Sequence, residues 1–264
     1  MKPVRPADNW PDSWKYSYPY DLLEVYGGTD GSAYAAAYAE RRRHTLELVR
    51  KAVAPPASIV DVAAAQGNFT LALAELGYDV TWNDLRADLA GYVQLKYERG
   101  IVHYAPGNAF ELAFDRLFDL ALITEVIEHV AHPDEFLINT ARLVRPGGYV
   151  LMTTPHGGYV RNTLPRFSDV ADPSVFESKQ FQPDADGHIF LLHTDEVHAL
   201  AAKAGLAVVE HRVFTNVLTN GHLKTAALHR VLPKSVIGAV ESVSTRLPGA
   251  ERFHTAMATL MQRV

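Results

Sequence analysis

Residues 57–155 alternate between short apolar runs, typical of buried strands, and longer segments with helical periodicity. The strand patterns occupy residues 57–64, 78–84, 101–109, 118–124 and 148–155. Helical patterns fill intervals between them, at residues 68–77, 86–100 and 134–143. Strands that alternate with helices run parallel, because each helix carries the chain back across the sheet. The sequence therefore predicts a doubly wound α/β fold with a mostly parallel sheet, which binds ligands beyond the carboxyl ends of its strands.

The segments before this region predict an N-terminal extension. Residues 31–53 are rich in Ala and Leu and predict a long helix that ends before Pro55-Pro56. The preceding residues are aromatic, and we expect them to line a pocket or to hold the N-terminus in place; they are Trp10, Trp14, Tyr16, Tyr18, Tyr20 and Tyr26. We divide the chain into a cap of residues 1–54 and a ligand-binding domain of residues 55–264.

The segments after residue 155 predict a loop and a closing unit. Residues 156–187 show no periodicity and are too many for an ordinary connection, so we expect a lid or substrate loop. A helix at residues 194–205 follows, and residues 222–247 predict further helix broken at Pro233. Residues 254–264 predict a closing strand.

Composition narrows the class of partner. The 264 residues include no cysteine, so a metal could be held only by oxygen and imidazole ligands, and we expect a cytoplasmic location. The N-terminus has no apolar signal-like run, and no apolar segment has the length of a membrane span. The net charge is −5 and the only basic run is residues 40–44, which disfavours binding to nucleic acid. We expect a small-molecule partner.

The turn after the first predicted strand indicates a nucleotide-type site. Asp61 ends that strand, and residues 63–67 lead into a helix whose free N–H groups favour a ligand. Asp84 ends the second strand, where a carboxylate can accept both hydrogens of a ribose diol. A dinucleotide site requires G-x-G-x-x-G, but the chain has Ala63, Ala65 and Gly67 at those positions, which disfavours nicotinamide chemistry.

Four motifs together resemble the class I S-adenosylmethionine-dependent methyltransferases. They are IVDVAAAQGN at 59–68, WND at 82–84, GNAF at 107–110 and LVRPGGYVLMTTP at 143–155. The resemblance implies a Rossmann-like, seven-stranded sheet and S-adenosylmethionine as cofactor. It also implies the cofactor-binding residues: Asp61, Ala63, Ala65, Gln66 and Gly67 beside the methionine part, Asp84 at the ribose, Asn108 and Ala109 at the adenine, and Thr124 at the end of the fourth strand.

Two departures from that family concern cofactor binding. Ala63 and Ala65 replace glycines and crowd the backbone wherever a positive φ is required. Asn108 replaces an acidic residue, which keeps an acceptor oxygen for the adenine amino group but removes a charge.

The segment TEVIEHVAH, residues 124–132, carries the titratable groups. A helix there would place its acids and histidines on one face; these are Glu125, Glu128, His129 and His132. The segment is similar to one in ubiquinone-biosynthesis O-methyltransferases and in small-RNA 2′-O-methyltransferases. The RNA enzymes imply a metal site for Mg²⁺ or Mn²⁺, with the ligands Glu125, Glu128, His129 and, as a fourth, His188.

The ubiquinone-type relatives imply instead that His129 acts alone as the base. His156, after the fifth strand, is a second candidate base, whereas His132 has no counterpart in the motif. No role is predicted for His103, His211 or His254.

These inferences together predict an enzyme that methylates a hydroxyl of a small metabolite or natural product, such as a sugar, polyketide or phenol. An RNA 2′-O-methyltransferase and a small-molecule N-methyltransferase are alternatives. A catalytically inactive partner that binds the cofactor is a further alternative, and the altered glycines make it conceivable. The sequence leaves the acceptor and the oligomeric state open.

Overall fold

A computed structural model describes residues 1–26, 33–180, 187–216 and 249–264, together with Val236, Ala239 and Val243. The helix predicted for residues 222–247 lies almost entirely outside the described residues.

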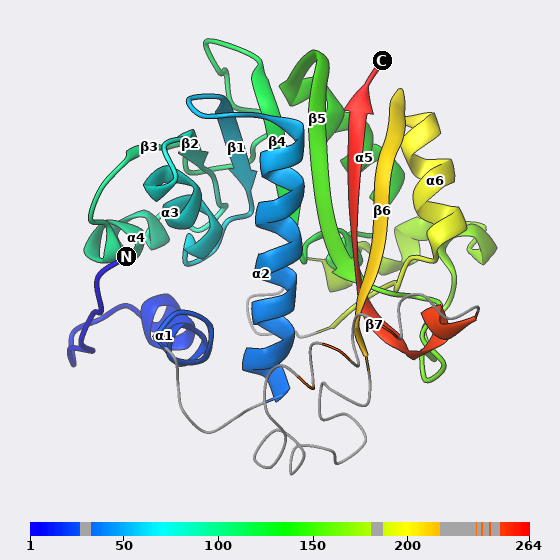
Figure 1. Ribbon diagram of the computed structural model, residues 1–264, viewed down its shortest axis with the longest axis horizontal. Coiled ribbons are helices and arrows are strands. Elements are labelled where there is room, and N and C mark those ends of the chain that lie inside the picture. The colour runs from blue at the N-terminus through cyan, green and yellow to red at the C-terminus, as the bar shows by residue number, and fades with distance from the viewer. Residues whose placement is uncertain (27–32, 181–186, 217–235, 237–238, 240–242, 244–248) are drawn as a thin grey trace.

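A seven-stranded sheet forms the centre of the molecule, with the strand order β3-β2-β1-β4-β5-β7-β6 (Figure 1). All neighbouring pairs from β3 to β5 are parallel, whereas β7 is antiparallel to both β5 and β6. The strands are β1 Ser58–Val62, β2 Asp79–Trp82, β3 Ile101–Tyr104, β4 Phe118–Thr124, β5 Val144–Pro155, β6 Leu206–Asn216 and β7 His254–Arg263. The predicted fold class and the closing strand are confirmed.

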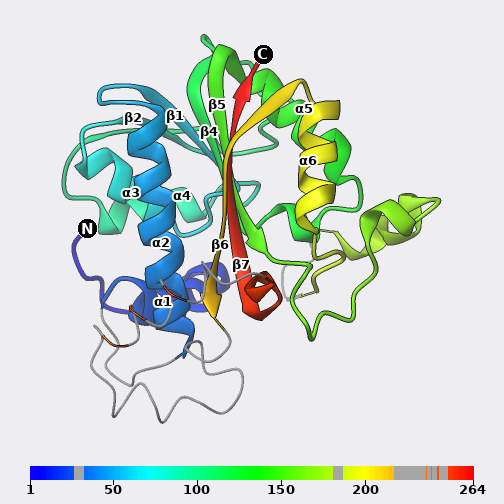
Figure 2. The same ribbon diagram turned by 45° about the vertical axis from the view of Figure 1, so that its right-hand side comes forward.

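Helices cover both faces of the sheet (Figure 2). The described α-helices are α1 Asp12–Glu24, α2 Ala33–Ala52, α3 Asn68–Glu75, α4 Leu89–Lys96, α5 Pro133–Leu143 and α6 Thr194–Lys203. The helix α2 packs over β5, β6 and β7, and its Leu48 and Val49 belong to the same buried apolar cluster as Ile59 of β1 and Val80 of β2. The helices α5 and α6 pack over the opposite face, where Leu137 and Val197 are fully buried. Of the described helices, none is long and apolar enough to cross a membrane.

The register brings the carboxyl ends of β1, β2 and β4 to one edge of the sheet. Asp61 of β1 lies beside Trp82 of β2 on one side and Leu122 of β4 on the other. The helix α1 lies beyond this edge and contacts α2 and α4 (Figure 1). Several residues at or just beyond the ends of these strands, among them Asp84 and Thr124, therefore share one cavity with residues of α1.

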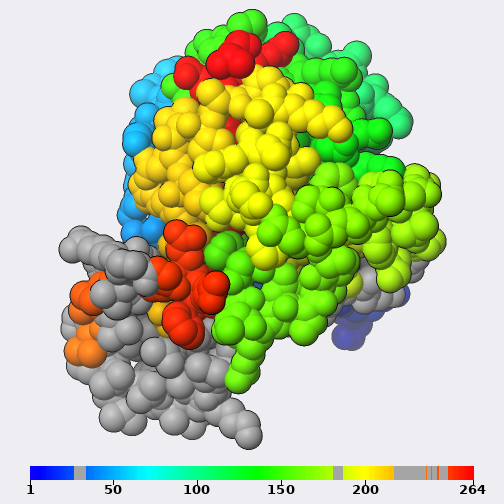
Figure 3. Space-filling view, turned by 90° about the vertical axis from the view of Figure 1, so that its right-hand side faces the viewer, coloured from blue at the N-terminus to red at the C-terminus, as the bar shows by residue number. Residues whose placement is uncertain are grey.

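Residues 156–180 contain only two 3₁₀ helices, η2 Phe167–Asp169 and η3 Pro173–Lys179. Figure 3 shows this segment against α6. At the start of α6 the Ser168 N–H donates to Glu196 at 2.9 Å, and Arg166 pairs with Asp195. The absence of α-helix and strand from these described residues agrees with the irregular loop predicted here.

The expectation of one helical face for residues 124–132 is wrong. The chain forms a single 3₁₀ turn, η1 Ile127–His129, between the end of β4 and Pro133, which begins α5. Glu125 has a φ of 54°, so the backbone directly after β4 does not adopt the conformation of a right-handed helix. As a result Glu128 points into the core and is fully buried, instead of sharing an exposed face with Glu125.

Candidate cofactor and acceptor site

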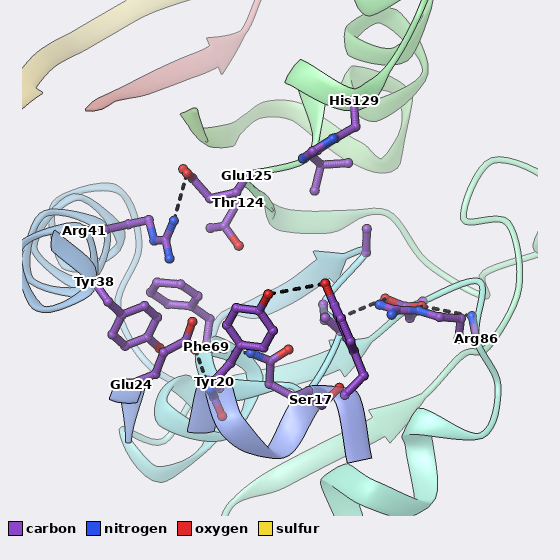
Figure 4. A pocket seen from close by; sticks show the side chains of 18 of the residues that line it. Ser17, Tyr20, Glu24, Tyr38, Arg41, Phe69, Arg86, Thr124, Glu125 and His129 are labelled. Atoms are coloured by element: carbon purple, nitrogen blue, oxygen red, sulfur yellow. Dashed lines mark hydrogen bonds and ion pairs between the residues drawn. The ribbon is translucent and has the colours of Figure 1, made fainter. Parts of the chain in front are cut away.

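A cavity of about 630 Å³ lies between the carboxyl edge of the sheet and the helices α1 and α2 (Figure 4). The strand ends contribute Ala63, Ala64, Ala65, Gln66, Asp84, Leu85, Arg86, Thr124, Glu125 and Val126. The helices α1 and α2 contribute Tyr16, Ser17, Tyr20, Glu24, Tyr34, Tyr38 and Arg41. Asn68, Phe69, His129 and Lys179 complete the lining. Its volume is within the range of sites for small ligands and cofactors.

The turn after β1 has a strained backbone, as expected if alanines replace glycines at positions that require a positive φ. Ala63 has a φ of 54° and Ala65 a φ of 47°, both in the left-handed region that favours glycine. Hydrogen bonds hold the turn in this form: the Ala64 N–H donates to the Asn83 carbonyl at 2.8 Å, and the Trp82 indole to the Ala65 carbonyl at 3.0 Å. Strain of this kind persists where surrounding contacts enforce it, and it is common at ligand sites.

Gly67 immediately precedes α3 and also has a positive φ, of 71°. A Cβ at this position would lie 2.7 Å from Cγ2 of Val93. Glycine is therefore required here by both backbone conformation and space.

The Asp84 carboxylate lies on the cavity wall directly after β2, where the sequence placed the ribose. Its Oδ2 atom accepts the Ala65 N–H at 2.9 Å, so the acid and the strained turn are linked. Its Oδ1 atom accepts the Arg86 backbone N–H at 2.9 Å.

Asp61 lies behind the turn and is not among the cavity-lining residues. Its Oδ2 atom accepts the Thr70 hydroxyl at 2.6 Å, and its buried Oδ1 atom has no hydrogen-bond partner among the described residues. Burial raises the pKa of the Asp61 carboxyl to about 7. Its observed contact therefore supports α3, and a direct contact with the methionine part remains a prediction.

Six further predicted site residues also lie outside the cavity lining: Gly67, Asn108, Ala109, Glu128, His156 and His188. The Asn108 side chain closes a local turn, since its Oδ1 atom accepts the Phe110 N–H at 3.1 Å, and Ala109 is buried in the core. His156 is buried, and its Nδ1 atom lies 3.2 Å from the His254 carbonyl oxygen. Burial lowers the pKa of His156. The structure does not place His156 where a base would meet an acceptor.

Glu125 is separated from the metal set that the sequence predicted. Its Oε2 atom lies 2.8 Å from Nη1 of Arg41, and its Oε1 atom accepts the Thr153 hydroxyl at 2.9 Å (Figure 4). Among the described residues, the group with ligand atoms within 4.8 Å of one another consists of Glu128, His129 and His188. The geometry therefore does not support Glu125 as a metal ligand beside Glu128, His129 and His188, because Arg41 already neutralises this carboxylate.

Glu128 is the buried member of that group. Its Oε2 atom accepts the Thr154 hydroxyl at 2.9 Å, while its Oε1 atom has no partner among the described residues. Burial, and secondarily the charge of Glu125, raise the pKa of Glu128 well above its usual value. Its backbone carbonyl accepts the Ile189 N–H at 2.7 Å, which brings the segment of His188 close to His129.

The sequence missed most of the cavity wall formed by α1 and α2. Aromatic density before residue 27 did suggest a pocket, and Tyr16 and Tyr20 do line it. No pattern in the sequence indicated that Glu24 and Arg41 belong to the site. Glu24 accepts hydrogen bonds from Asn68 at 2.8 Å and from Tyr34 at 2.6 Å, so it connects the helices to the start of α3.

Comparison with known proteins identifies the family. Residues 34–211 match the model of a methyltransferase domain family, and this match covers more than half of the chain. The chain belongs to this methyltransferase family. It is an S-adenosylmethionine-dependent methyltransferase with the mixed sheet order described above.

Individual relatives are more distant. A 98-residue segment is 31% identical to a ubiquinone biosynthesis O-methyltransferase of Rickettsia conorii and covers 36% of this chain and 34% of that protein. A 101-residue segment is 34% identical to the enzyme of the same name from Caulobacter vibrioides and covers 37% of this chain and 40% of the relative. The similarity thus spans about a third of each protein.

Solved structures share the fold at low identity. Magnesium protoporphyrin IX methyltransferase of Synechocystis is 11% identical with a TM-score of 0.57, covering 96% of this chain and 94% of that one. The N-methyltransferase NodS of Bradyrhizobium japonicum is 15% identical with a TM-score of 0.52, covering 86% of this chain and 87% of its own.

The residues of the methyltransferase fit its cofactor. The Asp84 carboxylate suits a ribose, and the small side chains of Ala63 to Ala65 let a ligand approach the turn. When bound, S-adenosylmethionine would supply an electrophilic methyl group; the acceptor's nucleophile would bond to that carbon as the carbon–sulfur bond breaks, with S-adenosylhomocysteine as the leaving group. The protein's contribution is to position the acceptor, to exclude water and to receive the proton of its nucleophile.

Proposed function

We propose that this methyltransferase acts on a hydroxyl group of a small metabolite or natural product, with His129 as the general base. One observation carries this assignment: His129 is the only imidazole among the described residues that line the cavity. It lines the same cavity as Thr124 and Glu125, at and just beyond the end of β4 (Figure 4). An imidazole there can take the hydroxyl proton as oxygen attacks the methyl group.

The cavity and the relatives support this kind of acceptor. Its wall combines tyrosine rings with charged groups, which suits a small hydroxylated molecule better than a polyanionic RNA backbone. The two relatives described above are named O-methyltransferases, which supports oxygen over nitrogen as the nucleophile.

The test replaces His129 with Gln and measures methyl transfer to a panel of phenols, sugar alcohols and amines. We expect His129→Gln to lower the rate by about 10²- to 10⁴-fold at neutral pH while cofactor affinity, measured by calorimetry, stays unchanged. The matched control is His132→Gln, because His132 pairs with Glu177 at 2.9 Å and does not line the cavity. Full activity in His129→Gln would exclude this base, and transfer to amines alone would replace the oxygen assignment.

A divalent metal at Glu128, His129 and His188 is a second candidate for activating the hydroxyl. It is supported by the unpartnered, buried Oε1 atom of Glu128 beside two imidazoles. A ligand set of two nitrogens and one oxygen suits Mn²⁺ or Zn²⁺ better than Mg²⁺, which prefers oxygen ligands.

Chelation and mutation distinguish activation by a metal from activation by His129 alone. Metal assistance predicts loss of activity in EDTA, recovery on adding Mn²⁺ or Zn²⁺, and no calorimetric binding of Mn²⁺ by Glu128→Gln. Activity that is indifferent to EDTA and to His188→Ala would leave His129 as the base without metal.

A further inference from the structure

We propose that the Arg86 side chain occupies the position of the cofactor's ribose on Asp84, and that it must be displaced before S-adenosylmethionine binds. Arg86 then sets the affinity for the cofactor. This inference concerns cofactor binding alone and is independent of the acceptor.

All acceptor positions of the Asp84 carboxylate are in use. In addition to the two backbone N–H groups, Oδ1 accepts Nε of Arg86 at 3.0 Å and Oδ2 accepts Nη2 at 3.3 Å. A carboxylate offers about four lone-pair positions in total. A ribose diol therefore cannot donate two hydrogen bonds to Asp84 unless existing donors leave.

The four donors differ in how easily they can leave. The N–H groups of Ala65 and Arg86 belong to the backbone of two adjoining loops, which the fold holds in place. The guanidinium of Arg86 is held only by Asp84 among the described residues, and its side chain is 39% exposed whereas that of Asp84 is 5% exposed. The side chain can thus rotate into solvent while the backbone bonds keep the carboxylate oriented.

Both residues line the cavity, so the exchange happens within the ligand site (Figure 4). Arginine and the ribose diol compete for the same two oxygen atoms, and the ion pair must break for each binding event. A partly exposed ion pair contributes little free energy. Breaking the pair of Arg86 with Asp84 should therefore raise the dissociation constant of the cofactor by only about two- to fivefold.

The experiment compares binding of S-adenosylhomocysteine to wild type and to Arg86→Met by calorimetry. Methionine keeps much of the side-chain length of arginine but removes its charge. S-Adenosylhomocysteine is the ligand of choice because it lacks the positive sulfonium, which would itself respond to a nearby cation. We expect Arg86→Met to bind about two- to fivefold more tightly than wild type at low salt. The difference should shrink at high salt, because salt weakens the competing ion pair in wild type.

Two controls define what would overturn the proposal. Arg116→Met removes another partly exposed arginine that pairs with an aspartate, Asp79, outside the cavity, and should leave affinity unchanged. In an Asp84→Asn background, Arg86→Met should give no tightening, because the competition acts through that carboxylate. Unchanged or weaker binding by Arg86→Met, or equal tightening in the Asp84→Asn background, would contradict displacement. Equal melting temperatures for the wild-type protein and Arg86→Met would confirm that the substitution leaves the fold unchanged.

Discussion

Lys96 Nζ lies 2.7 Å from Oδ2 of Asp21, and both side chains are completely buried. Asp21 also accepts the Tyr92 hydroxyl at 2.7 Å, and Lys96 also donates to Oδ1 of Asn68 at 2.7 Å. Asp21 belongs to α1, while its partners belong to α3 and α4, so this polar cluster fixes the cavity-covering helix to the sheet domain. Burial lowers the pKa of Lys96, although the charge of Asp21 opposes the shift.

Removing one member of this pair should strongly destabilise the protein. We expect Lys96→Met or Asp21→Asn to lower the free energy of unfolding by about 3–5 kcal/mol, because the remaining charge stays buried without its partner. Cofactor affinity should fall as well, since α1 supplies Tyr16 and Tyr20 to the cavity. Urea unfolding and calorimetry measure the two effects.

The control for this pair is Lys15→Met. Lys15 lies 3.6 Å from Asp12 with both side chains well exposed, and its removal should change stability very little. The combination of Asp21→Leu with Lys96→Met should be less harmful than either single change, because no buried charge is left. A single variant as stable as Lys15→Met would show that the cluster does not anchor α1.

The strained turn gives a second prediction with a built-in control. Ala63→Gly and Ala65→Gly should each stabilise the protein by about 0.5–1 kcal/mol, because glycine adopts their positive φ without penalty. Ala64 lies between them without a positive φ, so Ala64→Gly should destabilise by a similar amount through the entropy of the unfolded chain. Thermal unfolding of the three variants measures this. Equal effects at all three positions would show that the turn stores no local strain.

Local patterns were enough to predict the sheet and its cofactor edge. Buried strands such as β1 and β4 are mostly apolar, and their alternation with helices along the chain predicts the parallel topology. Asp84 could be placed from the sequence because its position at a strand end determines where it points. The effect of alanine in the first turn could likewise be anticipated, since it depends on the backbone of the turn alone.

The catalytic side of the cavity could not be predicted in this way. Glu125 looked like a ligand by spacing, but its partner Arg41 comes from a helix distant in sequence, and no local pattern encodes that contact. Helical spacing also failed for Glu128, because a single positive φ at Glu125 redirects the chain. His188, by contrast, does lie near His129, with ring centres 4.9 Å apart, and their shared role as metal ligands stays a prediction.

The buried carboxyl of Asp61 gives a pH-dependent prediction. Its pKa rises from 3.8 to about 7 on folding, so between these values the native state keeps a proton that the unfolded chain releases. The free energy of unfolding should therefore fall as the pH rises from about 4 to about 7, by at most about 1.4 kcal/mol per unit, and the contribution of Asp61 should level off above this range.

Asp61→Asn should flatten this dependence, because the amide does not titrate. Urea unfolding of wild type and variant at several pH values between 5 and 8 measures the two slopes. Identical slopes would show that another group, such as the buried Glu128, is responsible.

The loop after β5 gives the last prediction, which concerns its movement over the acceptor. Lys179 of η3 lines the cavity, and the adjoining Gln180 accepts the Ala131 N–H at 2.8 Å, so this part of the loop lies beside the residues that follow β4. We expect amide exchange in residues 173–180 to slow when S-adenosylhomocysteine and an acceptor bind together, because the loop then closes over the filled cavity. Residues 111–117 lie outside this cavity and serve as the internal control, with exchange unchanged by ligands. Equal protection of residues 173–180 in every state would mean that the loop is a fixed insertion and does not act as a lid.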